Sequence, residues 1–127
     1  MIDRITAEEI HDILIDKFGG SKGIRDIGAL LSALARPYAT FDQQELYPTV
    51  IEKAAAIFES IIINHPFIDG NKRIAYVLMR LVLLESGFDI SATQSEKYEM
   101  TIAASIGNLK NEEIKHWIKD KLVNNIK

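Results

Sequence analysis

Two strongly apolar segments, residues 50–63 and 74–84, dominate the sequence and meet at nine residues, 65–73, that are rich in polar groups. The second segment is apolar almost all round, which predicts a helix buried at the centre of a folded domain. Because Pro66 has no backbone N–H and disfavours helical geometry in the residue before it, the first helix should end near Asn64. The pattern therefore predicts two core helices joined by a short polar connection.

The polar connection contains groups suited to binding phosphate. Gly70 and Asn71 can supply a turn and an N-cap, so the second helix should begin near Asn71 or Lys72. A helix start carries free N–H groups and the positive end of the peptide dipole, and both favour an anion. Lys72 and Arg73 lie in that first turn, where two cations oppose the dipole unless a phosphate is bound there.

Two further side chains of the connection suit nucleotide chemistry. His65 is a candidate proton acceptor, since imidazole titrates near neutral pH. Asp69 offers a hard oxygen ligand for Mg²⁺ held jointly with nucleotide phosphates. Taken singly, such features are more often a helix stop, a turn or a solvated surface. Their combination between two apolar helices favours a functional site.

The order His-Pro-Phe-Ile-Asp-Gly-Asn-Lys-Arg at residues 65–73 closely resembles the signature of the Fic/Doc family, whose usual Fic form reads H-P-F-x-(D/E)-G-N-G-R-x-x-R. Seven defined positions match. Two differ, since Lys72 stands in place of a glycine and Tyr76 in place of the second arginine. Both differences are typical of the Doc branch of the family, the death-on-curing toxins. The sequence at residues 24–26 and 30–37 also resembles that of Doc proteins.

The resemblance covers roughly residues 5–87 and implies a single compact helical Fic/Doc domain over residues 1–127. It also implies an enzyme that uses ATP and Mg²⁺ and transfers a phosphorus group to a protein hydroxyl. In this scheme His65 removes the hydroxyl proton and Asp69 holds Mg²⁺. The implied nucleotide-binding residues are Gly70, Asn71, Lys72 and Arg73, of which Lys72 and Arg73 also neutralise charge during transfer and so join the catalytic set.

The Doc-like features imply transfer of the γ-phosphoryl group of ATP to a threonine of elongation factor Tu, which would stop protein synthesis. A separate Phd-type antitoxin is expected, because the self-inhibitory Fic pattern (S/T)-x-x-x-E-(G/N) is only partly matched at residues 95–100, where Met100 occupies its last position. Two alternatives remain open. One is a Fic-type adenylyltransferase that attaches AMP with the same residues, and the other is a helical interaction module without catalysis.

Composition narrows the class of protein. The chain has no cysteine, which excludes disulfides, thiolate zinc sites and cysteine nucleophiles. A net charge of −3 argues against a general nucleic-acid-binding protein. The N-terminus lacks a signal-peptide pattern, and the apolar run 77–84, interrupted by Arg80, is too short to cross a membrane. We therefore expect a cytoplasmic protein that binds neither nucleic acid nor membrane directly.

Helical periodicity and turn residues predict an all-α fold of about six helices. The expected ranges are about 7–18, 27–35, 50–64, 71–86 and 96–104, with a last helix that begins near residue 111 and includes Leu122. Residues 37–48, bounded by prolines, predict a long loop or a short β-hairpin. By resemblance, this segment corresponds to the flap with which Fic proteins grip a target segment. The alternative is that its aromatic side chains only hold the loop against the core.

Several single residues also receive predictions. A capping box from Thr6 to Glu9 should begin the first helix, and Asp26 should cap the second. A second capping box, from Thr49 to Glu52, should begin the helix that leads to His65. His11 is expected at the surface or boundary of the first helix, outside any site. By resemblance Arg25 could lie near the site. Arg80 should be paired structurally, His116 should be exposed, and residues 88–90 should form an extended link.

Overall fold

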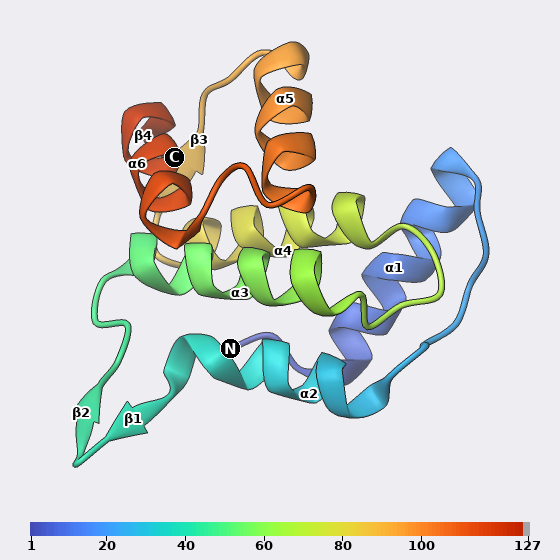
Figure 1. Ribbon diagram of the computed structural model, residues 1–127, viewed down its shortest axis with the longest axis horizontal. Helices are drawn as coiled ribbons and strands as arrows, with labels where there is room; N and C mark the ends of the chain where they lie inside the picture. Colours follow the sequence, from blue (N-terminus) through green and yellow to red (C-terminus); the bar gives the residue numbers. More distant parts are fainter. Residues whose placement is uncertain (126–127) are drawn as a thin grey trace.

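The computed structural model describes residues 1–125, which form six α-helices and two small antiparallel sheets (Figure 1). This confirms the predicted all-α fold with a short β-hairpin. The helices are α1 (Arg4–Phe18), α2 (Ile27–Ala35), α3 (Val50–Asn64), α4 (Asn71–Glu85), α5 (Gln94–Ser105) and α6 (Asn111–Lys121). A 3₁₀ turn η1 (Arg36–Tyr38) leads into the hairpin of β1 (Thr40–Phe41) and β2 (Gln44–Glu45), and β3 (Phe88–Ile90) pairs with β4 (Leu122–Asn124).

Helices α3 and α4 form the centre of the molecule and lie side by side, with α2 on one side and α5 and α6 on the other (Figure 1). Ala54, Ala55 and Ala56 of α3 are all fully buried, and such small side chains let two helices approach closely. The buried residues of α4 are Ile74, Ala75, Leu78, Met79, Val82 and Leu83. The two apolar segments recognised in the sequence therefore make the core.

Local capping residues set most helix starts. Asp26 and Thr49 accept hydrogen bonds from the first turns of α2 and α3, as predicted. The predicted start of α1 was wrong, because Asp3 caps that helix by accepting from the N–H of Thr6 at 2.8 Å. Helix α5 begins two residues before its predicted start, since Thr93 and Glu96 form a capping box.

The predicted extended link at residues 88–90 is strand β3, which pairs with β4 in the register Asp89 to Val123. Leu122 therefore belongs to a strand and not to the last helix. Arg80 donates to both carboxylate oxygens of Asp89 at 2.7 and 2.9 Å, which confirms its structural role. His116 is exposed, as predicted. Among the described residues, no helix combines the length and hydrophobicity that a membrane span requires.

The close contact of α3 and α4 leads to a stability prediction. Replacing Ala55 with leucine should lower the free energy of unfolding by about 1–3 kcal/mol, because the extra side chain has no space at this fully buried position of α3. Denaturant unfolding followed by circular dichroism measures the change. Ala35→Leu, at an exposed position of α2, is the matched control and should shift the free energy of unfolding by less than about 0.5 kcal/mol. Equal effects would show that the core around Ala55 is not closely packed.

Candidate functional site

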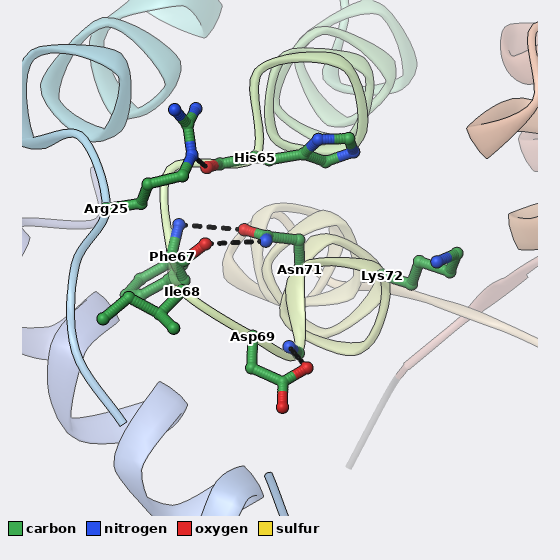
Figure 2. Close-up of a pocket in the computed structure, with 8 residues that line it drawn as sticks. Arg25, His65, Phe67, Ile68, Asp69, Asn71 and Lys72 are labelled. Atoms are coloured by element: carbon green, nitrogen blue, oxygen red, sulfur yellow. Dashed lines mark hydrogen bonds between the residues drawn. The ribbon is translucent and has the colours of Figure 1, made fainter. Parts of the chain in front are cut away.

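The connection between α3 and α4 borders a cavity of about 310 Å³. Its lining residues are Arg25, His65, Phe67, Ile68, Asp69, Gly70, Asn71 and Lys72. Figure 2 shows His65 and Lys72 extending toward the right of the view and Asp69 below them. Of the six residues expected at the site, only Arg73 is outside this lining.

Two residues with left-handed backbone geometry shape the connection. His65 ends α3 with φ 47° and ψ 61°, and its N–H donates to the carbonyl of Ile61. Gly70 precedes α4 with φ 72°. Glycine adopts this geometry freely, whereas histidine is strained in it, so His65 must be held in place by its surroundings. The result is an abrupt reversal of the chain that leaves His65 exposed at the cavity.

Asn71 holds the middle of the connection. Its Oδ1 accepts from the Phe67 N–H and its Nδ2 donates to the Phe67 carbonyl, both at 2.9 Å (Figure 2). The prediction that Asn71 could cap α4 was therefore wrong, because Gly70 occupies the N-cap and the Asn71 amide faces the preceding loop. Since glycine has no side chain, α4 begins without a side-chain cap. Its first-turn N–H groups remain suited to an anion.

The segment before α2 is hydrogen-bonded along this connection. The N–H groups of Arg25 and Asp26 both donate to the Pro66 carbonyl, at 2.8 and 3.0 Å. The N–H of Ile68 donates to the Gly23 carbonyl at 3.0 Å. These three backbone bonds fix residues on both sides of Phe67. The connection is therefore part of an ordered two-segment unit, not a free loop.

The side chain of Arg25 binds the end of α3. Its Nε donates to the His65 carbonyl at 2.6 Å (Figure 2). Its guanidinium also donates to the Asn64 carbonyl. A cation is favourable here, because the last carbonyls of a helix carry the negative end of its dipole. The structure thus places Arg25 at the site and gives it a direct contact with the strained His65.

The Asp69 side chain is exposed, yet two hydrogen bonds fix the orientation of its carboxylate. Its Oδ1 accepts from the Gly70 N–H at 2.8 Å, and its Oδ2 accepts from the Ser21 N–H at 3.1 Å. Gly20 allows this approach, since a Cβ at that position would lie 2.7 Å from Oδ2. The loop from α1 therefore needs a glycine in order to reach Asp69.

The site offers a single carboxylate to a metal ion such as Mg²⁺. Among residues 1–125, no group of three or more histidine, aspartate or glutamate side chains is arranged to hold a metal ion. Asp69 alone would be a protein ligand, with phosphate oxygens and water completing the shell. Mg²⁺ commonly binds in this way, through one or two carboxylates and substrate phosphates. The site therefore fits a metal that arrives with a nucleotide.

His11 was missed by the sequence analysis, and its predicted position was wrong. It is only 1% exposed, its Nε2 lies 2.7 Å from the Asp69 carbonyl oxygen, and its ring stacks on Phe67 at 4.0 Å. Sequence reasoning placed no partner near it because Asp69 is distant in the chain. One signal was present in the sequence: Ala7 and Ile15, one helical turn on either side of His11, are both apolar, which indicates the face of the helix that turns to the core.

The two cations of the first α4 turn lie in different surroundings. Lys72 is exposed and lines the cavity. The Arg73 guanidinium instead lies 4.0 Å from the centre of the Phe18 ring, a favourable cation–π contact with α1. One turn later, the buried hydroxyl of Tyr76 has no hydrogen-bond partner among the described residues, and burial raises the pKa of this group to about 12.

Comparisons with known proteins agree with the signature. The model of the Fic/DOC family matches residues 2–83. Toxin Doc from Mycolicibacterium smegmatis is 41% identical over 75 residues, which cover 59% of this chain and 58% of the toxin. Protein adenylyltransferase fic-1 from Caenorhabditis elegans is 34% identical over 73 residues, which cover 54% of this chain and 14% of that protein. The chain thus spans less than two thirds of the relatives that it matches.

The Asn71 contacts lead to a second prediction. Asn71→Ala should lower the free energy of unfolding by about 1–3 kcal/mol, because the Phe67 N–H and carbonyl lose their partners in a partly buried place. Denaturant titration provides the measurement. The control is Asn108→Ala, which changes an exposed asparagine in the turn after α5. If both variants are equally stable, the carboxamide does not hold the connection.

Proposed function

The chain belongs to the Fic/DOC family, and from this membership we propose that it is a Doc-like toxin with kinase-type activity. It transfers the γ-phosphoryl group of ATP to a threonine hydroxyl of elongation factor Tu and thereby arrests protein synthesis. The similarity to Toxin Doc supports the toxin class. The target is proposed from the Doc-like features of the signature.

One observation carries the proposal: a candidate base, a carboxylate, a cation and an uncapped helix start all border one cavity. His65 takes the proton of the attacking hydroxyl, whose oxygen forms a bond to the γ-phosphorus. The bond from that phosphorus to the β–γ bridging oxygen breaks, and ADP leaves with the electron pair. Positioning and charge stabilisation account for most of the catalysis in such transfers.

The remaining residues bind and stabilise phosphate in this scheme. Asp69 would hold Mg²⁺, which when bound neutralises charge on the phosphates. The Gly70 N–H is bonded to the Asp69 carboxylate, so the backbone N–H groups that face the phosphate oxygens begin at Asn71, beside the side-chain-free Gly70. Lys72 supplies a positive charge from the cavity wall. Arg73 is proposed to add a second charge, which requires its guanidinium to leave the Phe18 ring.

Two side chains favour γ-phosphoryl transfer over attachment of AMP. The long cationic chain of Lys72 fills space that the usual Fic glycine leaves open beside the helix start. Tyr76 replaces the second arginine of the Fic signature, and its buried neutral hydroxyl provides no comparable phosphate clamp. Both differences change how phosphates can lie on α4. They support a nucleotide bound the other way round, with its γ-phosphate toward the target hydroxyl.

Adenylylation of a protein hydroxyl is the second candidate, supported by the similarity to protein adenylyltransferase fic-1. The same His65 would then act on a hydroxyl that attacks the α-phosphorus. The third candidate function is that of a non-catalytic interaction module. It would keep the fold and bind a partner without any transfer.

The proposed protein partners fit exposed features of the surface. The hairpin β1–β2 has exposed strands, which could pair with an extended segment of the target. Apolar side chains that remain exposed on α2 and near the hairpin include Ile27, Leu31, Phe41 and Leu46. An amphipathic helix of a Phd-type antitoxin could cover such side chains. A cytoplasmic location follows from a target in the translation machinery.

An intact-mass assay tests the function. Elongation factor Tu incubated with this protein, ATP and Mg²⁺ should gain the mass of one phosphoryl group. His65→Ala should slow the transfer by about 10²–10⁴-fold, because the general base is lost. The control is His116→Ala, which removes an exposed imidazole on α6 and should leave the rate unchanged.

The added mass separates the three functions. A gain of AMP would replace the kinase proposal with adenylylation. No gain on elongation factor Tu or on proteins of a cell extract, together with nucleotide binding that His65→Ala does not affect, would favour the binding module. Equal loss of activity in the His65 and His116 variants would contradict the assigned role of His65.

A further inference from the structure

His11 has two contacts with the connection that carries the site, although it belongs to α1 and has no part in the proposed chemistry. Its Nε2 is 2.7 Å from the carbonyl oxygen of Asp69. Its ring lies against Phe67, with 4.0 Å between ring centroids and an interplanar angle of 9°. Among the buried residues of α1 it alone is polar, and only 1% of its surface is exposed.

The hydrogen bond fixes which ring nitrogen carries the proton. A carbonyl oxygen can only accept, so Nε2 must be the donor in this contact. The carboxylate of the same aspartate accepts from the N–H groups of Gly70 and Ser21. The backbone and the side chain of Asp69 are therefore held from three directions. His11 supplies the only one of these three bonds that comes from a side chain.

The space around His11 is tight. A Cβ placed on Gly70 would lie 3.5 Å from His11 Nε2 and 3.2 Å from the Cδ1 of Ile15. Helix α1 thus packs directly beneath the turn that leads into α4. The ring rests on Phe67, whose backbone Asn71 already clamps. A shift of His11 would therefore be transmitted to Asp69.

A purely structural explanation accounts poorly for a histidine here. The neighbouring buried positions of α1, one turn before and after, are Ala7 and Ile15, and an apolar residue at position 11 would fill the same space. Burial of an imidazole costs free energy unless its polar atoms are satisfied. The bond to Asp69 offsets that cost. Compared with an apolar residue, histidine adds one hydrogen bond, which fixes the position of the Asp69 carbonyl.

We propose that His11 is the positioning residue for Asp69. The Nε2–H bond to the Asp69 carbonyl sets the orientation of this peptide, and so the direction in which the carboxylate presents its free lone pairs to a nucleotide-bound Mg²⁺. The inference rests on the proposed function, since it assumes that Asp69 is the metal ligand. Groups that orient metal ligands typically change metal affinity by about 10–100-fold when they are removed.

Two variants separate the hydrogen bond from the ring. His11→Phe keeps a flat ring for stacking on Phe67 but has no donor. His11→Gln keeps an N–H donor at a similar reach but has no ring. Titration calorimetry would measure the binding of Mg²⁺ to the full chain loaded with a non-hydrolysable ATP analogue. Thermal unfolding of each variant, followed by circular dichroism, reports the stability of the fold.

We expect His11→Phe to weaken Mg²⁺ binding by at least about tenfold and to raise the Mg²⁺ concentration for half-maximal transfer in proportion. His11→Gln should restore most of both. Mg²⁺ affinity unchanged in His11→Phe would overturn the inference. Equal losses in the two variants would also overturn it, because packing on Phe67 would then be the cause.

A measurement on the unmodified protein keeps the test valid if a variant does not fold. Nitrogen-15 spectra of the histidine side chains should show His11 with its proton on Nε2, protected from exchange with water. A proton on Nδ1 alone, with Nε2 unprotonated, would refute the hydrogen bond. If the wild-type protein binds no Mg²⁺ with the nucleotide, the proposed function fails; if it binds and His11→Phe binds equally well, only the role of His11 fails.

Discussion

The site depends on holding a strained reversal of the chain between two buried helices. His65 has a left-handed backbone at φ 47°, which costs free energy for a residue with a Cβ. Three separate parts of the chain offset that cost: Asn71 on α4, the segment around Arg25, and His11 on α1. Each contacts the backbone of the connection and leaves the His65 and Asp69 side chains exposed. The two side chains proposed to act in the reaction can therefore be oriented without being buried.

Much of the fold could be predicted because its signals are local. A cap is read from one or two neighbouring residues, so Asp26 and Thr49 gave accurate starts for α2 and α3. Pro66 likewise predicted the end of α3 at Asn64. The candidate residues of the site also follow one another along the chain. Five of the six therefore had to lie near one cavity once the two helices were recognised.

Two of the missed features involve partners that are distant in sequence. Nothing near His11 indicates that its ring meets Phe67, and nothing near Phe88 indicates that it pairs with Asn124. Asn71 was misjudged for a different reason. An asparagine beside a helix start can cap that helix or bond to the preceding loop, and Gly70 decides between them by taking the N-cap position. Local chemistry allows both outcomes, and only the path of the chain selects one.

Charge explains how a chain of net charge −3 could attract a polyanion such as ATP. The cavity lining contains Arg25 and Lys72 against the single carboxylate of Asp69, and the uncapped start of α4 adds the positive end of a helix dipole. Two of the N–H groups of Arg25 already donate to carbonyls at the end of α3. Lys72 is thus the cation most free to meet a phosphate. In the proposed function, its presence where other Fic signatures have glycine would affect both the affinity for the nucleotide and the direction in which the nucleotide lies.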